Sequence, residues 1–263
     1  MKTYNIFLDY YDKIVRSINN PVEDEVNFLV DECIRKYNPD AKTILETACW
    51  TGVVAKELVK KWFEVTGLDI NENMLEKAED NIDKKNLVLW DMTDFDLGKT
   101  FDTVLCNYNS ICHLLTWQEW QSFFEMSAKH LDKWWLFVFD INTLFEFESI
   151  TRDFAQFYNF WEDTVCLEMR KTSPQPSPLE EREQDQNINY SWFIYEWFIK
   201  IFKKSQDWRY DLIEEVVKEN SFPISKIKKE LKEKWFDILD IIDYHYGEVT
   251  AESERVYFIC RKT

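Results

Sequence analysis

Glycine is scarce in this sequence: only 4 of the 263 residues are glycine, whereas 12 are tryptophan. An average usage of roughly 7% predicts about 18 glycines in a chain of this length. The glycines and tryptophans taken together come close to that expectation. The shortage of one residue and the excess of the other therefore suggest a common cause.

A positive net charge, long apolar runs and C-x-x-C cysteine pairs are also missing. The net charge of −17 repels phosphate backbones and anionic membranes, which argues against a nucleic-acid or membrane partner. No segment has the apolar run of a membrane span, and the N-terminus lacks a signal-peptide core, so we expect a cytoplasmic protein. The cysteines form no C-x-x-C pair, which favours reduced thiols over disulfides or a metal site. They are Cys33, Cys49, Cys106, Cys112, Cys166 and Cys260.

The first part of the chain alternates between helical and strand patterns, after two helical patterns at Tyr4–Ile18 and Val22–Tyr37. Such alternation predicts a parallel sheet covered by helices on both faces. The apolar content of 45% is enough to bury its core. The expected strands are Thr43–Glu46, Phe63–Leu68, Leu87–Leu89, Thr103–Cys106 and Leu136–Asp140, and the expected helices between them are Val53–Lys61, Asn73–Asp83 and Gln118–Leu131.

A different pattern begins near Asp163, where long β-rich runs replace the alternation. The runs Asn187–Phe202 and Trp208–Val217 predict a small antiparallel lid inserted after the fifth strand. Helix Ile224–Lys234 and strands Phe236–Tyr244 and Arg255–Arg261 then return to the main sheet. We therefore expect an N-terminal helical cap at 1–40, a core at 41–150, a lid at 151–222 with a disordered, proline-rich loop at 172–186, and the end of the core at 223–263.

The segment Thr43–Leu58, TILETACWTGVVAKEL, carries the most informative motif. It resembles the first motif of class I S-adenosylmethionine (SAM)-dependent methyltransferases, usually (D/E)-x-x-C-G-T-G. The resemblance covers nearly the whole chain and implies an α/β, Rossmann-like sheet with SAM as the cofactor. Trp50 departs from the motif. Glycine is expected there because the turn takes unusual backbone angles and the cofactor packs directly on the main chain.

Other tryptophans also stand where this family places glycine: Trp62, Trp90, Trp134, Trp135 and Trp235. Our hypothesis is that the gene uses UGA codons for glycine and that these are translated here as tryptophan. The alternative is a tryptophan-rich relative in which Trp50 is genuine, leaving a catalytically dead or non-catalytic protein of the same fold. For the remaining tryptophans the sequence does not decide between a genuine tryptophan and a glycine: Trp117, Trp120, Trp161, Trp192, Trp197 and Trp208.

The resemblance assigns the cofactor to the turns that follow the first strands. Backbone amides between Glu46 and Gly52 face the methionine carboxylate, where the following helix dipole favours an anion. Asp69 fits the acidic residue that binds the ribose hydroxyls, and Asp91 the acceptor for the adenine amino group. Taken singly, each aspartate fits a turn or helix cap equally well. The predicted cofactor-binding residues are Glu46, Ala48, Cys49, Trp50, Gly52, Asp69, Ile70, Met74, Asp91, Met92 and Asn107.

Further segments resemble small-molecule N-methyltransferases that dimethylate amino sugars and, more loosely, glycine N-methyltransferases. These segments are Trp90–Asp102, Ser110–Leu114, Asp9–Asp12 and Arg255–Lys262. The resemblance implies a small-molecule acceptor, an amine in the first instance, and a monomer or homodimer. A protein or nucleic-acid methyltransferase is the alternative. Amino-methylating DNA enzymes carry (N/D)-P-P-(Y/F) after the fourth strand, where this chain reads Asn107-Tyr-Asn-Ser110.

An amine acceptor needs a base, because a free alkylamine with a pKa of about 10.4 is protonated near neutrality. An imidazole, with a pKa of about 6.5, suits that task. His113 lies just beyond the fourth strand, where the amino-sugar enzymes place their proposed base, although a packed or capping histidine is the alternative. The predicted substrate residues are Tyr10, Tyr11 and His245, which helix packing or a strand end also explains.

Overall fold

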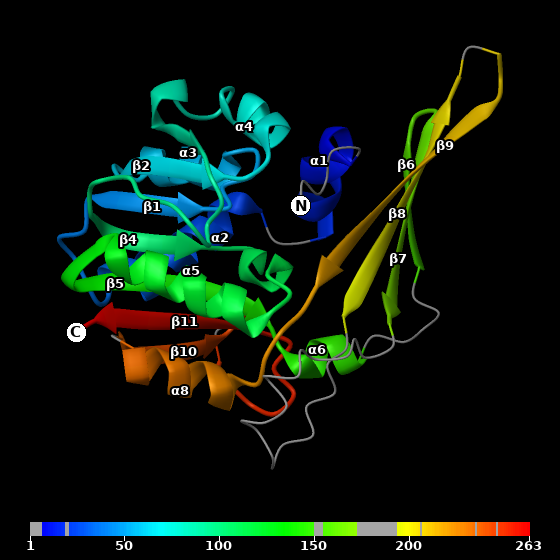
Figure 1. The fold of residues 1–263 in the computed structure, drawn as a ribbon. Coiled ribbons are helices and arrows are strands. Elements are labelled where there is room, and N and C mark those ends of the chain that lie inside the picture. Colours follow the sequence, from blue (N-terminus) through cyan, green and yellow to red (C-terminus); the bar gives the residue numbers. More distant parts are fainter. Residues whose placement is uncertain are drawn as a thin grey trace.

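The computed structural model describes residues 7–18, 21–149, 155–172, 194–205, 207–234, 236–245 and 247–263. Figure 1 shows how these segments are arranged. Apart from Thr172, the predicted loop at 172–186 lies outside the described residues. Trp192 and Trp235 also lie outside them.

A seven-stranded sheet, ordered β10-β11-β5-β4-β1-β2-β3, forms the centre of the described molecule. β1 to β5 pair in parallel, whereas β11 runs antiparallel to both β5 and β10. This topology confirms the predicted sheet, to which the last two strands return as expected. The strands are β1 Thr43–Thr47, β2 Glu64–Asp69, β3 Leu87–Leu89, β4 Phe101–Cys106, β5 Leu131–Asn142, β10 Phe236–Asp243 and β11 Arg255–Lys262.

Helices cover both faces of this sheet, as predicted (Figure 1). One apolar core joins the sheet to α5 and α8 and includes Trp120 and Phe139, and a second joins it to α2, η1 and α3 and includes Leu58. The start of α5 is fixed by a capping box, in which Thr116 and Glu119 satisfy each other's backbone N–H groups. The bounds are α2 Val22–Phe28, η1 Leu29–Arg35 (a π-helix), α3 Val53–Lys60, α4 Glu72–Ala78, η2 Lys84–Asn86, α5 Trp117–Lys129 and α8 Ile224–Lys234.

A four-stranded antiparallel sheet, which we call the lid sheet, follows β5 and the short helix α6 (Leu144–Ser149), at the predicted place in the chain. Figure 1 shows it extending away from the central sheet. Helix α1 (Leu8–Ile18) joins the two parts, because its buried face packs against Met74 of α4 and Ile199 of the lid sheet. The lid strands are β6 Ala155–Phe160, β7 Asp163–Lys171, β8 Tyr195–Lys204 and β9 Tyr210–Glu219.

The bounds of β5 and α4 differ from the predicted ones. β5 begins at Leu131 rather than at Leu136, because it already pairs there with Phe101 of β4. The register then shifts before the next pair, Thr103 with Leu136, so the residues between Leu131 and Leu136 form a bulge within the strand. Helix α4 ends at Ala78 and is shorter than predicted.

Several tryptophans adopt backbone angles that favour glycine. Among the described non-glycine residues with positive φ are Trp50 (52°), Trp62 (74°), Trp134 (77°), Trp161 (52°) and Trp208 (66°). A bulky side chain is a steric outlier in this region. The backbone thus supports the glycine hypothesis at the first three positions and extends it to Trp161 and Trp208. Trp90 and Trp135 are not among the described residues with positive φ, so their backbone does not call for glycine.

Candidate functional site

Two cavities open at the carboxyl edge of the central sheet. The first, which we call the edge cavity, has a volume of about 280 Å³ and is bordered by Asp69, Asp91 and Met92 at the ends of β2 and β3. The second, the lid cavity, has a volume of about 410 Å³ and is bordered by residues of both the core and the lid sheet, among them Glu219. The two linings share Trp50 and His113, so the cavities meet at these residues.

Asp69 is a buried carboxylate at the edge cavity, where β2 ends. Its Oδ2 accepts a hydrogen bond of 2.8 Å from the backbone N–H of Trp50, and its Oδ1 accepts one of 2.8 Å from that of Asn71. Burial raises the pKa of Asp69 to about 6, although these hydrogen bonds oppose the rise. The helix cap of α4 is Asn71, whose side chain accepts from the N–H of Asn73, so Asp69 does not act as that cap.

The turn after β1 has left-handed backbone at Ala48, Trp50 and Gly52. Gly52 also packs closely, since a Cβ atom added there would lie 3.1 Å from Cβ of Ala78. The hydroxyl of Thr51 donates to Oδ1 of Asp12 at 2.9 Å, which ties the turn to α1. The sequence motif therefore folds as expected, with a turn that suits glycine better than a large residue.

The Trp50 side chain fills the place where the two cavities meet. Its ring stacks on Tyr11 of α1, with the centroids 4.8 Å apart and the planes 7° from parallel. Its Nε1 donates a hydrogen bond of 2.9 Å to Oγ of Ser110. The His113 ring lies 5.5 Å away between centroids. The indole is thus held firmly by its contacts with α1 and with the segment after β4.

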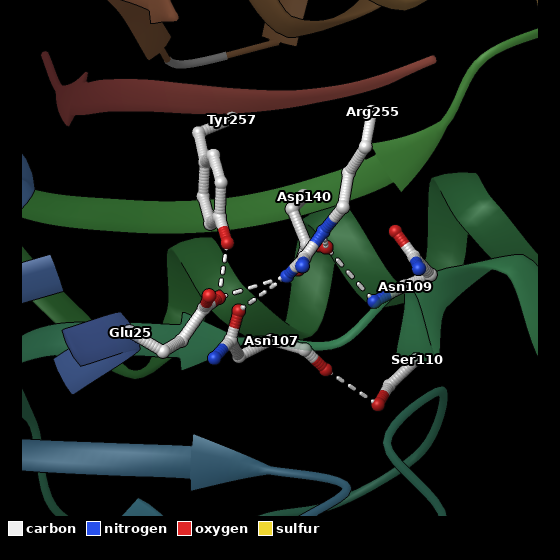
Figure 2. A network of polar contacts seen from close by, with 7 residues as sticks. All are labelled: Glu25, Asn107, Asn109, Ser110, Asp140, Arg255 and Tyr257. Atoms are coloured by element: carbon white, nitrogen blue, oxygen red, sulfur yellow. Dashed lines mark hydrogen bonds and ion pairs between the residues drawn. The ribbon is translucent and has the colours of Figure 1, made fainter. Parts of the chain in front are cut away.

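A buried polar network contacts the segment that follows β4 (Figure 2). Arg255 of β11 contacts Asp140 of β5 (Nε to Oδ2, 2.5 Å) and Glu25 of α2 (Nη2 to Oε1, 2.9 Å). It also donates to Oδ1 of Asn107 at 3.2 Å, while Tyr257 donates to Glu25. Burial raises the pKa of Asp140 to about 6, although Arg255 opposes the rise. The network joins the last strand, the second helix and the end of β4.

The same network fixes the backbone that presents His113. Oδ2 of Asp140 accepts from the N–H of Asn109 at 2.9 Å, and Ser110 donates from its hydroxyl to the carbonyl of Asn107 at 2.7 Å (Figure 2). Asn109 has a left-handed φ of 55°, a conformation that asparagine tolerates. The 3₁₀-helix η3, Ser110–His113, then carries the imidazole to the cavity junction.

The end of the lid sheet also contacts His113. Nδ1 of the ring lies 3.4 Å from the carbonyl oxygen of Lys218, and Nε2 lies 3.9 Å from Oε1 of Glu219. The next residue, Asn220, holds this approach in register, because its backbone N–H donates to the carbonyl of Cys112 at 2.8 Å. An imidazole with an adjacent carboxylate is an arrangement suited to accepting a proton.

The structure gathers most of the predicted cofactor residues at the edge cavity. Those that line it are Ala48, Trp50, Asp69, Ile70, Met74, Asp91 and Met92. Glu46, Cys49, Gly52 and Asn107 line neither of the two cavities. Glu46 and Cys49 are buried at the end of β1 and in its turn, and Asn107 belongs to the Arg255 network.

The predicted substrate residues are dispersed. Tyr11 lines the lid cavity. Tyr10 turns to the lid sheet, where its hydroxyl donates to Oδ2 of Asp163 at 2.6 Å. His245 is exposed in the turn after β10 and lines neither cavity; its ring is tilted by 59° to that of Tyr244.

Three carboxylates of the lid cavity were not anticipated from the sequence: Glu146, Glu219 and Glu254. They come from α6, from the end of β9 and from the residue before β11. They belong to no motif, and only the folding of the lid sheet onto the core brings them to one cavity.

No group of three or more His, Cys, Asp or Glu side chains that could hold a metal ion occurs within the described ranges. The six cysteines are buried free thiols. None of the helices in the described part of the chain has the length and apolar composition needed to cross a membrane.

The residues of the edge cavity fit SAM. Two carboxylates, Asp69 and Asp91, can accept hydrogen bonds from hydroxyl and amino groups, while Ile70, Met74 and Met92 offer apolar surface to a flat ring. The Trp50 indole lies at the end of this cavity that faces His113. The lining of this cavity is therefore suited to an adenosine group, and the bulky Trp50 side chain occupies the end beside His113.

Comparisons with known proteins agree with this fit. A family model described as a methyltransferase domain matches residues 44–133. A Geobacillus sp. (strain WCH70) protein named as a methyltransferase is 26% identical over 274 residues, which cover 99% of this chain and 100% of the relative. A dTDP-3-amino-3,4,6-trideoxy-alpha-D-glucopyranose N,N-dimethyltransferase of Streptomyces venezuelae is 29% identical over 124 residues, 47% of this chain and 52% of that protein.

A solved structure shows the same fold over nearly the whole chain. The crystal structure of an S-adenosylmethionine-dependent methyltransferase from Clostridium acetobutylicum ATCC 824 has a TM-score of 0.78 and 21% identity, with 98% of each chain covered. Its likeness extends beyond the region matched by the family model to the lid sheet and the last strands. From the fold, the edge cavity and these relatives, the chain is a class I SAM-dependent methyltransferase, with SAM as its cofactor.

Proposed function

We propose that this enzyme methylates a small-molecule amine that binds in the lid cavity, with His113 as the general base. The observation that carries the proposal is the position of His113, which borders both the edge cavity and the lid cavity. A base at that junction can reach an acceptor in one cavity while the methyl donor occupies the other. The relative from Streptomyces venezuelae, named as an N,N-dimethyltransferase of an amino sugar, supports an amine acceptor.

The cofactor contacts are part of the same proposal. Asp69 would hold the ribose hydroxyls and Asp91 the adenine amino group, with Ile70 and Met74 against the ring. The turn from Glu46 to Gly52 would direct its backbone toward the methionine carboxylate. When bound, SAM supplies a methyl group on a positively charged sulfur.

The chain's own residues would then align and deprotonate the acceptor. His113 takes a proton from the protonated amine, and Glu219, with Oε1 at 3.9 Å from Nε2, stabilises the resulting imidazolium. The lid sheet and α1 cover the cavity and exclude water. Holding the acceptor at the junction supplies the orientation that an in-line displacement needs.

The test is His113→Ala, assayed for SAM binding by calorimetry and for methyl transfer to an amine. We expect unchanged SAM affinity and a rate lower by about 10²–10⁴-fold. The loss should shrink as pH rises, because more of the acceptor is then already deprotonated. His245→Ala, at an exposed turn, is the matched control and should keep full activity. A pH-independent rate defect together with a lower melting temperature would assign His113 a structural role instead.

One observation favours a second function. The Trp50 indole stands between the two cavities, as expected of a non-catalytic protein that keeps the fold. Calorimetry with SAM on the protein that carries Trp50 and on its Trp50→Gly variant distinguishes the enzyme from the non-catalytic protein. SAM binding by Trp50→Gly supports the enzyme, whereas the absence of binding by either form would favour the non-catalytic protein.

A further inference from the structure

The lid cavity is strongly acidic. Glu146, Glu219 and Glu254 all line it. Glu219 is only 7% exposed, and its Oε2 has no hydrogen-bond partner within the described residues. A buried carboxylate oxygen without a partner is costly unless a ligand supplies a donor or a positive charge.

The described cations near this cavity are already engaged. Arg255 also lines the cavity, but its guanidinium contacts Asp140 and Glu25. Lys218, next to Glu219, pairs with Glu196 at 3.1 Å. Burial raises the pKa of Glu146, and the charges of Glu254 and Glu219 raise it further, so Glu146 is close enough to be repelled by the other two carboxylates.

Aromatic rings complete the cavity. Tyr11, Trp197 and Tyr244 line it together with the three carboxylates. Aromatic faces attract cations, and they do so more strongly where water is excluded. The combination of acidic and aromatic side chains suits an organic cation and repels a phosphate group.

We propose, on the basis of the function proposed above, that the acceptor is a small diamine, with a second ammonium group besides the nitrogen that is methylated. Glu219, beside His113, receives the reacting ammonium, and Glu146 and Glu254 receive the second one. The relative from Streptomyces venezuelae is named for a dTDP-linked amino sugar, whose diphosphate is an anion. This cavity would reject such a substrate.

The experiment compares three acceptors, namely putrescine, butylamine and a dTDP-linked amino sugar, on the chain and on its Trp50→Gly variant. The readout is formation of S-adenosylhomocysteine. We expect kcat/KM to be highest for putrescine, lower for butylamine and lowest for the anionic sugar. Glu254→Gln and Glu146→Gln should each raise the KM for putrescine by roughly 10-fold or more, without changing SAM affinity. Glu162→Gln, in the lid hairpin outside the cavity, is the matched control.

The outcomes separate the two proposals. If SAM binds but none of the amines is methylated, the proposed function fails. If amines are methylated but the dTDP-linked sugar is preferred over putrescine, the diamine proposal alone is overturned. Unchanged KM values in both glutamine variants would overturn it as well.

A second inference concerns the tryptophans with left-handed backbone. Trp62 occupies the position after the C-cap of α3: its N–H donates to the carbonyl of Val59 at 3.0 Å, and the N–H of Phe63 donates to that of Leu58 at 3.2 Å. This pair of hydrogen bonds defines the Schellman motif, in which glycine normally stands at that position. The Trp62 side chain is 90% exposed and gains no packing in return.

The other positions also have glycine geometry. Trp161 is the first residue of the two-residue loop between β6 and β7, a place that takes glycine when its φ is positive. Trp134 lies in the bulge of β5, and Trp208 in the loop between β8 and β9. The exposed fractions of Trp161, Trp134 and Trp208 are 105%, 59% and 82%.

Two buried tryptophans of the same chain look different. Trp117 and Trp120 lie in α5, where both are buried in the core. Trp120 is fully buried and donates from Nε1 to the carbonyl of Leu114 at 2.9 Å. The structure thus distinguishes two groups of tryptophans. Those in α5 are packed in the core, whereas the four at positions 62, 134, 161 and 208 are exposed and have left-handed backbone angles.

The geometry points to glycine at positions 50, 62, 134, 161 and 208 in the protein that the cell makes, encoded by UGA. At position 50 the consequence is functional, because loss of the indole joins the edge cavity to the lid cavity. We expect UGA at these five codons and UGG at those of Trp117 and Trp120. UGG at the five codons overturns the proposal.

A stability measurement tests the same point on the protein. Each of the four changes at positions 62, 134, 161 and 208 to glycine should raise the melting temperature by about 2–4 °C, since a left-handed bulky residue stores strain. Trp120→Gly is the control and should lower it, because a buried side chain is deleted. Equal or lower melting temperatures for the four variants would contradict the inference.

Discussion

Asp69 is buried although its side chain is a carboxylate. The side chain is 5% exposed, and both carboxylate oxygens already accept hydrogen bonds from backbone N–H groups of the flanking turns. These bonds orient the carboxylate toward the edge cavity before any ligand arrives. Preorganisation of this kind reduces the free energy that binding has to spend on ordering the site.

Asp69→Ala should weaken SAM binding by roughly 10- to 100-fold, because a charge-assisted hydrogen bond contributes about 1.5–3 kcal/mol. Calorimetry measures the affinity, and circular dichroism checks that the variant is folded. Asp91→Ala is a useful comparison at the same cavity. An unchanged dissociation constant in Asp69→Ala would move the ribose contact to another residue.

The raised pKa of Asp69 makes SAM affinity depend on pH. Since burial raises this pKa to about 6, the carboxyl is ionised above pH 6 and protonated below it. Under the proposed contact the ribose hydroxyls then lose a charged acceptor, so the dissociation constant should rise as the pH falls from about 7 to 5. Asp69→Asn should bind weakly with a flat pH profile. The same slope in both proteins would trace the effect to another group.

At the scale of elements, the segment between β4 and α5 is held by residues far away in the chain. Glu25, Asp140 and Arg255 come from α2, β5 and β11, and they meet beneath it (Figure 2). Their charges lie in the protein interior, so the arrangement is favourable only while each group keeps its partner. The network therefore fixes where His113 stands relative to both cavities.

Arg255→Met should destabilise the protein by about 3–5 kcal/mol, because it leaves two carboxylates buried without a cation. Urea unfolding measures the loss. Arg170→Met is the control: Arg170 pairs with Glu168 at an exposed site of the lid sheet, and such a pair contributes about 0–1 kcal/mol. Equal losses in the two variants would show that the buried network does not stabilise the fold.

At the scale of the whole molecule, α1 is one of the elements that connect the lid sheet to the core. It contacts the turn after β1 through Asp12, α4 through Asp9 and Lys77, and the lid sheet through Tyr10. The lid cavity exists only because this helix and the end of β9 bring the lid sheet to the core (Figure 1). The acidic surface of the molecule, with a net charge of −17, adds a long-range field.

That field should attract a cationic acceptor. Electrostatic steering raises association rates by about 10–10³-fold and is screened by salt. We therefore expect kcat/KM for putrescine to fall by roughly 10-fold between low and high ionic strength. A neutral hydroxylated amine analogue, tested at a pH where it is uncharged, should show little change. Salt-independent kinetics for putrescine would argue that the net charge has no part in recognition.

The order of strands and helices in the core could be predicted from the sequence, because apolar periodicity reports directly on burial. β3 and α8 have the predicted bounds, and Asp69, Asp91 and Met92 lie at the predicted edge. The bulge of β5 could not be predicted, since its start depends on pairing with Phe101 of another strand. The motif predicted that glycine belongs at position 50. No such prediction was possible for Trp161, which lies in a lid without a motif.

The sequence by itself determined the fold class, the cofactor and the position of His113, because those depend on local patterns and on the ends of neighbouring parallel strands. Tertiary structure alone decided the lid cavity. Glu146, Glu219 and Glu254 lie in segments separated by long stretches of chain, and they share one cavity only after β9 returns to the core. It also decided that Asn107 supports the network and that His245 stays in solvent. The physical reason is that contacts between distant segments leave no periodic trace in the residues that make them.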